Sequence, residues 1–355
     1  MKKLPLHDSH LARGAKMVSF GGYEMPIHYG SLKEEHLAVR NGCGVFDVSH
    51  MGEFFISGPH ALKLVQLVSS NDASKLVIGQ AQYAYLPNED GGIVDDFVIY
   101  RLSEEQYLMV VNASNIEKDW QWIQSKNKVG AKMENLSDNY CLLAVQGPKA
   151  VGLLQSLTEV SLADIKNYHF EIGRFAGVDD VIISATGYTG AGGFELYVKS
   201  DEVVKVWDQL FEIDQIAPAG LGARDLLRIE MGYCLYGNDI NDKTSPLAAG
   251  LGWVTKFTKE FVNSSNLSKE KETGSKEKLV GFLMTEGGIP RQGYKVFSMD
   301  GEEIGKVTSG TQSPILSQGI GLGYVQKGYS KKDTLLNIQI RDKMKTAKVV
   351  RPPFI

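Results

Sequence analysis

Cysteine is scarce in this 355-residue sequence, and its few copies lie far apart. Cys43, Cys141 and Cys234 form no C-x-x-C pair, so neither a disulfide framework nor a cysteine-rich zinc site is predicted. The histidines are also scattered, and His7 and His10 lack both the H-E-x-x-H spacing and a plausible third ligand nearby. We therefore expect reduced, buried thiols and no metal site.

Long apolar runs are absent as well. The opening residues, MKKLPLHDSH, lack the apolar stretch of roughly 7 or more residues that a signal peptide needs, and no run approaches the length that spans a bilayer. Charge of one sign is not in excess, because 38 basic and 42 acidic residues give a net charge of -4. The sequence predicts a cytoplasmic protein with neither a membrane nor a nucleic-acid partner.

The segments that are present indicate an α+β fold with more than one domain. The length exceeds one hydrophobic core, which favours two or three domains. Residues 31–40, SLKEEHLAVR, predict a helix that begins at a serine cap, and residues 201–212 predict an amphipathic helix. Residues 81–113 read as three strands joined by short turns, which indicates an antiparallel meander. Sheets with attached helices are the α+β class.

The chain changes character at residues 256–278, which carry six lysines and four glutamates with little apolar content. We interpret this stretch as a linker. Beyond it, short apolar segments alternate with Gly, Ser and Asp turns to the end of the chain. Their spacing predicts a small all-β barrel or sandwich.

Two adjacent aspartates, Asp95 and Asp96, lie inside the apolar strand of GGIVDDFVIYR (91–101). Side chains alternate along a strand, so the two carboxylates face opposite ways and both have apolar neighbours. An ionised carboxylate away from water must be hydrogen-bonded, paired or protonated, and these conditions also tune an acid or a base. Alternation alone does not choose between the two, and no G-x-S-x-G elbow supplies a serine nucleophile instead.

The glycine-rich stretch GYTGAGGFELYV (187–198) is not a phosphate loop, because a strand follows it where a phosphate site needs a helix. It is typical of a hairpin loop. Alternation in the strand puts Glu195 on the same face as Tyr197, which suggests that Glu195 points into a partly aromatic pocket.

Arg224 and Asp225 lie at the head of a short helix in APAGLGARDLLRIEMGYCLYGNDI (217–240). Asp225 suits the positive end of the helix dipole, but Arg224 does not. Arg224 either forms a structural ion pair or recognises a planar ligand or carboxylate through forked hydrogen bonds.

These segments together resemble the aminomethyltransferase, or T-protein, family of the glycine cleavage system. The resemblance covers nearly the whole chain, in order and at similar spacing. It runs through LHDSHLARGAKMVSFGGYEMPIHYG, FDVSHMGEF, YLPNEDGGIVDDFVIYR, VVNASNIEKD, AVQGPKA, TGYTGAGGFEL, GLGARDLLRIEMGYCLYGNDI, SPLAAGLGWV, GGIPRQGYKVF, IGKVTSGTQSPILSQGIGLGYV and VVRPPF.

The resemblance implies three domains in a cloverleaf around a central funnel that binds folate. We expect residues 1–57 and 141–255 to form the first domain, residues 58–140 the second, residues 256–278 the linker, and residues 279–355 the barrel. It also implies a reaction. The aminomethyl group on the dihydrolipoyl arm of H-protein passes to tetrahydrofolate, giving 5,10-methylenetetrahydrofolate, ammonia and the dithiol arm.

The resemblance also assigns residues. The family's catalytic aspartate, the second of the acidic pair, matches Asp96, and its pterin-recognising glutamate and arginine match Glu195 and Arg224. We further expect that the cavity is lined by Met51, Tyr83, Asn112, Tyr188 and Trp253. Tetrahydrofolate supplies its own nucleophilic nitrogens, so no metal, flavin or nicotinamide is expected.

The expected partner is lipoylated H-protein, with the glycine decarboxylase and dihydrolipoyl dehydrogenase components as indirect partners. Three alternatives compete with this reading. A folate-dependent demethylase component would normally need a flavin-binding portion, and no dinucleotide fingerprint occurs. A non-enzymatic folate-binding factor for iron-sulfur protein maturation would carry a lysine-glycine-cysteine-tyrosine signature, whereas Cys234 here follows a tyrosine. In a purely structural β-rich protein, the acidic pair, Glu195 and Arg224 would be unrelated.

Overall fold

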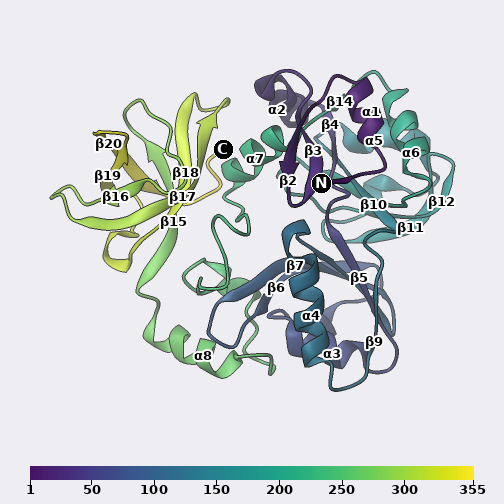
Figure 1. Ribbon diagram of the computed structural model, residues 1–355, viewed down its shortest axis with the longest axis horizontal. Coiled ribbons are helices and arrows are strands. Elements are labelled where there is room, and N and C mark those ends of the chain that lie inside the picture. Colours follow the sequence, from purple (N-terminus) through teal and green to yellow (C-terminus); the bar gives the residue numbers. More distant parts are fainter. The chain divides into compact units, whose positions relative to one another are not determined.

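The computed structural model describes residues 1–355 and divides into two compact units. One unit comprises residues 1–84 and 96–225, and the other comprises residues 85–95 and 226–355. Both contain sheets with attached helices, which confirms the α+β class (Figure 1). No helix is both long enough and apolar enough to cross a bilayer.

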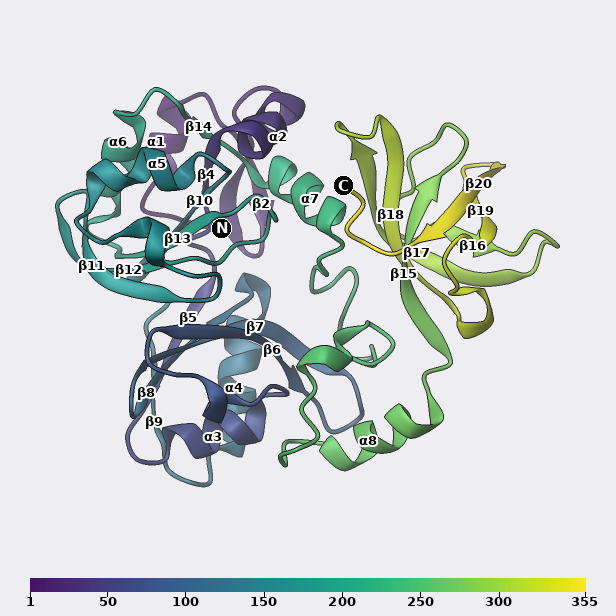
Figure 2. The same ribbon diagram turned by 180° about the vertical axis from the view of Figure 1, so that it is seen from behind.

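A six-stranded sheet is central to the first unit, with strand order β11-β12-β13-β10-β4-β14. The chain leaves this sheet after β4 and returns as β10, which pairs with both β4 and β13. Helices α5 and α6 pack on one face, where Trp207 and Leu210 join a core of strand residues (Figure 2). The elements are β4 (Cys43–Asp47), β10 (Tyr140–Gln146), β11 (Phe170–Phe175), β12 (Val178–Ser184), β13 (Gly193–Lys199), β14 (Ile216–Pro218), α2 (Leu32–Asn41), α5 (Ala150–Leu154) and α6 (Val203–Phe211).

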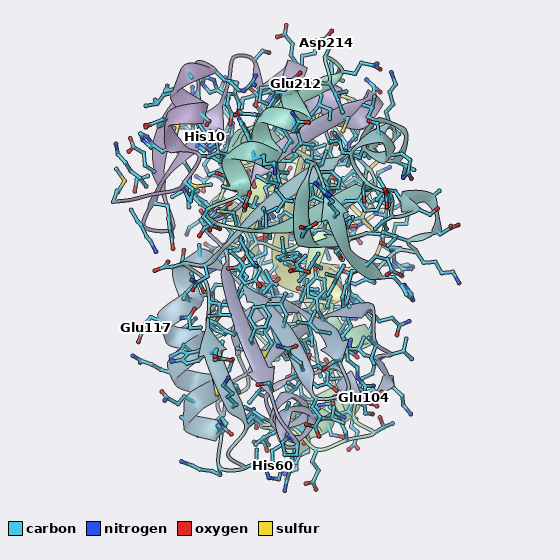
Figure 3. The ribbon with its side chains drawn as sticks, turned by 90° about the vertical axis from the view of Figure 1, so that its right-hand side faces the viewer. His10, His60, Glu104, Glu117, Glu212 and Asp214 are labelled. Atoms are coloured by element: carbon cyan, nitrogen blue, oxygen red, sulfur yellow. The ribbon has the colours of Figure 1, made fainter.

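A five-stranded sheet with the order β6-β7-β8-β5-β9 contains the predicted meander. Helices α3 and α4 cover one of its faces, where Phe54 packs edge-on against Trp120 (Figure 1). Glu117 projects from the outer side of α4 in Figure 3. The elements are β5 (Gly52–Ser57), β6 (Gln80–Pro87), β7 (Ile93–Ser103), β8 (Gln106–Val111), β9 (Lys132–Asn135), α3 (Ala61–Val68) and α4 (Ile116–Lys126).

The N-terminal segment forms a small sheet of its own and is anchored by a buried histidine. His10, labelled in Figure 3, contacts Asp47 Oδ2 through Nε2 at 2.9 Å and Tyr29 Oη through Nδ1 at 2.8 Å. Burial alone would raise the pKa of Asp47, but hydrogen bonds with His10 and Ser49 hold it below its ordinary value. The elements are β1 (Lys2–Lys3), α1 (His7–Ala12), β2 (Lys16–Phe20) and β3 (Tyr23–His28).

Most of the helices and strands predicted for the first unit are present. Helix α2 begins after Ser31, whose Oγ accepts the Glu34 N–H, as the serine cap predicted. Both aspartates lie within one strand, β7, and Glu195 lies on β13 after a glycine-rich loop. Single-turn helices complete the chain: η1 (Ala73–Lys75), η2 (Ala113–Asn115), η3 (Gln155–Leu157), η4 (Leu162–Asp164), η5 (Leu251–Val254) and η6 (Lys327–Tyr329).

The second unit contains a closed six-stranded barrel, which confirms the predicted C-terminal β-barrel. Its interior is apolar and includes Phe282, Val296 and Ile338. Helix α7 (Leu221–Met231) begins in the first unit and ends in this one. The strands are β15 (Glu277–Met284), β16 (Lys295–Phe297), β17 (Glu303–Ser313), β18 (Gln318–Gln326), β19 (Leu335–Ile340) and β20 (Lys343–Val350).

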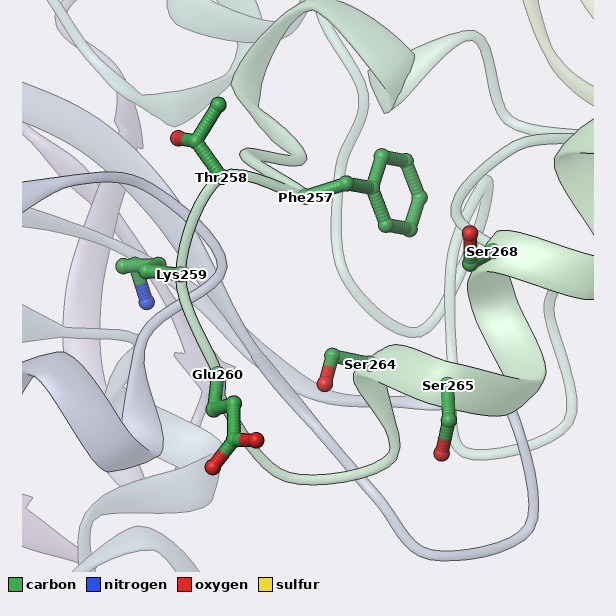
Figure 4. Close-up of a pocket in the computed structure, with 7 residues that line it drawn as sticks. All are labelled: Phe257, Thr258, Lys259, Glu260, Ser264, Ser265 and Ser268. Carbon is green, nitrogen blue, oxygen red and sulfur yellow. The ribbon is translucent and has the colours of Figure 1, made fainter.

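The lysine-rich stretch interpreted as a linker contains a helix, α8 (Ser264–Thr273). The helix buries Leu267, and Glu270 accepts hydrogen bonds from Ser245 and Ser275. The serines on α8 and the loop before it line a pocket of about 280 Å³ (Figure 4). The boundaries of the predicted domains stay a prediction.

Candidate active site

Asp96 lies in the middle of β7 and is held by donors from the strands on both sides. Tyr83 Oη, on β6, donates to Asp96 Oδ2 at 2.8 Å. Asn112 Nδ2, just after β8, donates to Asp96 Oδ1 at 2.9 Å and to its backbone carbonyl oxygen at 3.0 Å. The carboxylate is only partly buried, whereas Asp95 is fully enclosed. The orientation of Asp96 is therefore fixed while it keeps access to solvent.

Glu195 lies on the face of β13 that points away from helices α5 and α6, as the alternation of the strand predicts. Its Oε2 accepts a hydrogen bond of 2.5 Å from Thr186 Oγ1. Burial raises the pKa of Glu195 above its ordinary value, although the Thr186 hydrogen bond and the positive charge of Arg224 both oppose this. The site therefore holds a carboxylate whose charge depends on a small number of neighbours.

Arg224 lies in the first turn of α7, where its N–H bonds to the carbonyl oxygen of Gly220. Its guanidinium carbon lies 4.5 Å from the centroid of the Tyr188 ring, which is a cation–π contact. The glycine-rich loop and the helix head thus meet through these two side chains. The guanidinium is partly buried.

His50 lies in the turn between β4 and β5 and is buried beside this arginine. Its ring packs edge-on against Phe20 and Tyr23 of the N-terminal sheet. Burial and the charge of Arg224 lower the pKa of His50 to about 3, so the imidazole is neutral at physiological pH. The arginine is thus the positive group of this neighbourhood.

The head of α7 is positioned by Glu35, a buried residue of α2. Glu35 Oε1 accepts the Tyr29 N–H at 2.7 Å, and Oε2 accepts the Gly220 N–H at 2.9 Å. Gly220 has no room for a side chain, because a Cβ would lie 2.5 Å from the Ile27 carbonyl group. The turn that carries Arg224 is therefore packed directly against the backbone of β3.

The loop that carries Tyr188 is held by Gln146, at the end of β10. Gln146 Nε2 donates to the carbonyl oxygens of Thr186 and Phe194 at 3.1 and 3.2 Å, and its Oε1 accepts from Thr189 Oγ1 at 2.8 Å. Gly187 leaves the room that this amide needs, because a Cβ there would lie 2.0 Å from Gln146 Oε1. The loop conformation is therefore set by one buried amide.

The structure brings the predicted residues into two groups. Asp96, Tyr83 and Asn112 form one, on the five-stranded sheet, while Glu195, Arg224 and Tyr188 form the other. Met51 follows His50 in the turn before β5 and is partly buried. Trp253, in η5 of the second unit, is 63% exposed.

Sequence reasoning missed several residues that support these groups. Thr186 and Gln146 lie beside the glycine-rich loop. Glu35 accepts a hydrogen bond from the turn before α7, and His50 is buried near Arg224. Only Thr186 had a usable signal, since it directly precedes GYTG. The others are brought to the site by strand pairing and helix packing between distant parts of the chain.

The arrangement suits a flat, polar heteroaromatic ligand. Glu195 and Arg224 offer complementary acceptor and donor edges, and Tyr188 offers an aromatic face. Asp96 provides an oriented carboxylate for holding or moving a proton. A few convergent polar groups among aromatic side chains are typical of small-molecule sites.

Family models cover most of the chain. The GCVT N-terminal domain matches residues 6–259, and the glycine cleavage T-protein C-terminal barrel domain matches residues 277–355. An aminomethyltransferase of Flavobacterium psychrophilum is 57% identical, over 100% of this chain and 99% of the relative. An aminomethyltransferase of Bacteroides fragilis shows the same identity and coverage.

A solved structure agrees with these matches. The crystal structure of glycine cleavage system aminomethyltransferase T from Bartonella henselae superposes with a TM-score of 0.94 at 32% identity. The match covers 100% of this chain and 98% of that one. From its sequence, its barrel and its overall likeness to that enzyme, the chain belongs to the glycine cleavage T-protein family of aminomethyltransferases.

Proposed function

We propose that the protein is the aminomethyltransferase of a glycine cleavage system and that Asp96, Glu195 and Arg224 carry its activity. The observation that carries the proposal is the full-length match to aminomethyltransferases, together with a carboxylate at the predicted position, oriented from both sides. The donor substrate is the aminomethylated dihydrolipoyl arm of H-protein, and the acceptor is tetrahydrofolate. H-protein is the direct partner, and the compartment is the cytoplasm.

Atoms balance in this reaction without any further reactant. The carbon of the aminomethyl group loses its bonds to sulfur and to the amino nitrogen and gains bonds to N5 and N10 of tetrahydrofolate. Those two nitrogens give up one proton each, while the sulfur and the departing ammonia accept one each. The protein therefore needs to position the reactants and to handle protons.

Asp96 is the group that handles protons in this proposal. Its two oxygens are engaged by Tyr83 and Asn112, both neutral donors, so the carboxylate holds its place without being neutralised by them. We assign it the hydrogen bond to the reacting edge of the pterin near N5 and N10, and the acceptance or relay of one proton.

Glu195 and Arg224 bind the polar end of the pterin in this proposal. Glu195 accepts from N–H groups, Arg224 donates to a ring oxygen or nitrogen, and Tyr188 packs against a face of the ring system. Tyr83, Asn112, Met51 and Trp253 are proposed to line the remainder of the cavity. No observation favours the alternatives of an iron-sulfur maturation factor or a demethylase component.

The test is a reconstitution with aminomethylated H-protein, measuring ammonia and 5,10-methylenetetrahydrofolate with and without tetrahydrofolate. We expect both products in equal amounts, and their formation at full rate only with tetrahydrofolate. A competent H-protein that yields neither product would refute the proposal. Binding of tetrahydrofolate without turnover would favour a folate-binding factor instead.

A further inference from the structure

A layer of buried hydroxyl groups lies between the two large sheets of the first unit. Asp96 and Tyr100 share one face of β7, and Glu195 and Tyr197 share the face of β13 that lies opposite. Tyr197 Oη donates to Tyr100 Oη at 2.8 Å, and their rings meet edge-on at 5.4 Å between centroids. Tyr100 and Tyr197 are fully buried. Two hydroxyls in such a place are costly unless both are bonded.

The chain of hydroxyls continues from Tyr100 to Glu195. Tyr100 Oη lies 3.1 Å from Thr186 Oγ1, which in turn lies 2.5 Å from Glu195 Oε2. Thr186 is buried, and its Oγ1 also lies 3.0 Å from Ser184 Oγ. Every hydroxyl between Tyr197 and the carboxylate therefore has a neighbour on both sides.

The number of protons on each group limits the direction of the hydrogen bonds between these hydroxyls. Each hydroxyl carries one proton, and a carboxylate only accepts. Thr186 must therefore donate to Glu195, and Tyr100, which accepts from Tyr197, can give its own proton to Thr186. The series of three hydroxyl donors thus ends at Glu195 Oε2, and Glu195 Oε1 is the oxygen that a ligand can use.

We propose that Tyr197, Tyr100 and Thr186 are positioning residues that hold Glu195 as an oriented carboxylate for the N–H edge of the pterin. The proposal rests on the proposed function and adds residues that act only through Glu195. The chain also ties the Asp96 strand to the Glu195 strand, because Tyr100 lies on the Asp96 face of β7. The separation of the proton-handling and ligand-binding carboxylates is therefore set by a hydrogen-bonded layer.

The structure offers a matched control for the loss of a buried tyrosine hydroxyl. Tyr107, on β8, is as buried as Tyr100, but its hydroxyl has no hydrogen-bond partner. Tyr107→Phe removes a buried tyrosine hydroxyl from the same unit and leaves the hydrogen bonds from Tyr197 to Glu195 intact. Thr186→Ser provides a second control, because it keeps the hydroxyl that Thr186→Val removes.

The experiment measures the affinity of folded variants for tetrahydrofolate, with kcat and KM, between pH 5 and pH 8. We expect Tyr100→Phe and Thr186→Val to weaken tetrahydrofolate binding about 10-fold, the scale of one lost hydrogen bond to a charged group, with a smaller change in kcat. Binding should also be lost at a higher pH as the solution is acidified, because Glu195 loses donors that favour its charged form. Tyr107→Phe should behave like the original protein, and Thr186→Ser should recover the affinity that Thr186→Val loses.

A double variant separates this inference from the assignment of the site. Glu195→Gln should weaken binding, and Tyr100→Phe added to Glu195→Gln should cause almost no further loss, because the chain no longer ends on a carboxylate. Fully additive losses, or an unchanged pH midpoint in both Tyr100→Phe and Thr186→Val, would overturn the inference while leaving the proposed function in place. Unchanged binding by Glu195→Gln would instead refute the role of Glu195 itself.

Discussion

Glu195 and Asp239 are both acids bonded by hydroxyl groups, but their surroundings differ. Asp239 is fully enclosed in the second unit, where Oδ2 accepts from Arg228 Nη1 at 2.7 Å and from the Leu235 N–H at 2.9 Å. Ser309 Oγ also donates to Oδ2, and Thr308 Oγ1 donates to Oδ1. Both of its oxygens accept hydrogen bonds from the protein, and a cation neutralises it.

The region around Glu195 is organised differently. Glu195 is partly buried, one of its oxygens ends a chain of neutral hydroxyls, and its positive neighbour Arg224 stacks on Tyr188. This comparison separates a structural acid from a binding acid. A structural acid is bonded at both oxygens and paired with a cation, whereas a binding acid is oriented by the protein but keeps one oxygen for its ligand.

The largest expected effect follows from breaking the structural pair. Arg228→Met leaves Asp239 as an unpaired buried charge, which should lower the free energy of unfolding by about 3 to 5 kcal/mol. Urea unfolding followed by circular dichroism measures this loss. Arg291→Met is the control, because Arg291 is exposed in the same unit and should change stability by less than about 0.5 kcal/mol. If the two variants were equally stable, the description of Asp239 as a structural acid that depends on Arg228 would be wrong.

The next largest effect is expected in catalysis, at Asp96. Asp96→Asn keeps the size of the side chain but removes its charge and basicity, so kcat should fall by about 100-fold or more while tetrahydrofolate binding stays nearly normal. Steady-state assays with aminomethylated H-protein measure both quantities. Asp90→Asn, in the exposed turn before β7, serves as the control. Near-normal turnover of the Asp96 variant would show that this carboxylate does no chemistry.

A smaller effect is expected at the binding arginine. Arg224→Lys keeps the charge but loses the planar fork and the stacking on Tyr188, so the affinity for tetrahydrofolate should fall about 10-fold with little change in stability. Titration calorimetry with tetrahydrofolate under anaerobic conditions measures the affinity. Arg174→Lys, at an exposed ion pair in the same unit, should change nothing. A large loss of stability in the Arg224 variant would place Arg224 with Arg228 as a structural residue.

A third kind of buried acid has neither a cation nor a hydrogen-bond donor, and its effect depends on pH. Glu53, on β5, is buried with no hydrogen-bond partner for either carboxyl oxygen. Burial, with a smaller contribution from the nearby Asp138, raises its pKa well above the ordinary value. Above a pH of about 4.3 the unfolded chain releases this proton while the folded protein keeps it, so Glu53 lowers stability as the pH rises.

Glu53→Gln should remove this dependence. The variant should gain stability relative to the original protein as the pH rises from 4.5 to 8, with a slope of at most about 1.4 kcal/mol per pH unit, the limit for one proton. Urea unfolding at several pH values measures the slope. Glu134→Gln, on the exposed edge strand β9, should leave it unchanged. Parallel stability curves for the original protein and the Glu53 variant would show that Glu53 is ionised when buried.

Local patterns predicted the elements that local physics controls. Ser31 predicted the start of α2, the alternation of β13 predicted that Glu195 and Tyr197 share a face, and the turn spacing after residue 278 predicted the strands of the barrel. The composition of residues 256–278 is that of a solvated chain and carries no signal for a helix. Helix α8 buries Leu267, and its Glu270 accepts a hydrogen bond from Ser245, 25 residues earlier.

The candidate site could likewise be predicted only in part from local patterns. The pattern of β7 shows that Asp95 and Asp96 face opposite sides, but the preference for Asp96 came from a resemblance to a family. The donors of Asp96, Tyr83 and Asn112, come from the neighbouring strands β6 and β8, and pairing between strands is a property of the sheet. Helix position alone likewise does not predict that Arg228, one turn after Arg224, pairs with a buried aspartate.

The α+β class, most of the helices and strands, the barrel and the family of this chain could all be predicted from the order of its residues. These follow from capping, alternation, turn residues and ordered motifs, which act over a few residues at a time. Other features depend on folding: Asp96 is held from both sides, and Glu35 positions the head of α7. The hydrogen bonds that lead from Tyr197 through Tyr100 and Thr186 to Glu195 also form only in the folded protein. Their partners are distant along the chain, so the interactions exist only after the sheets and helices have packed.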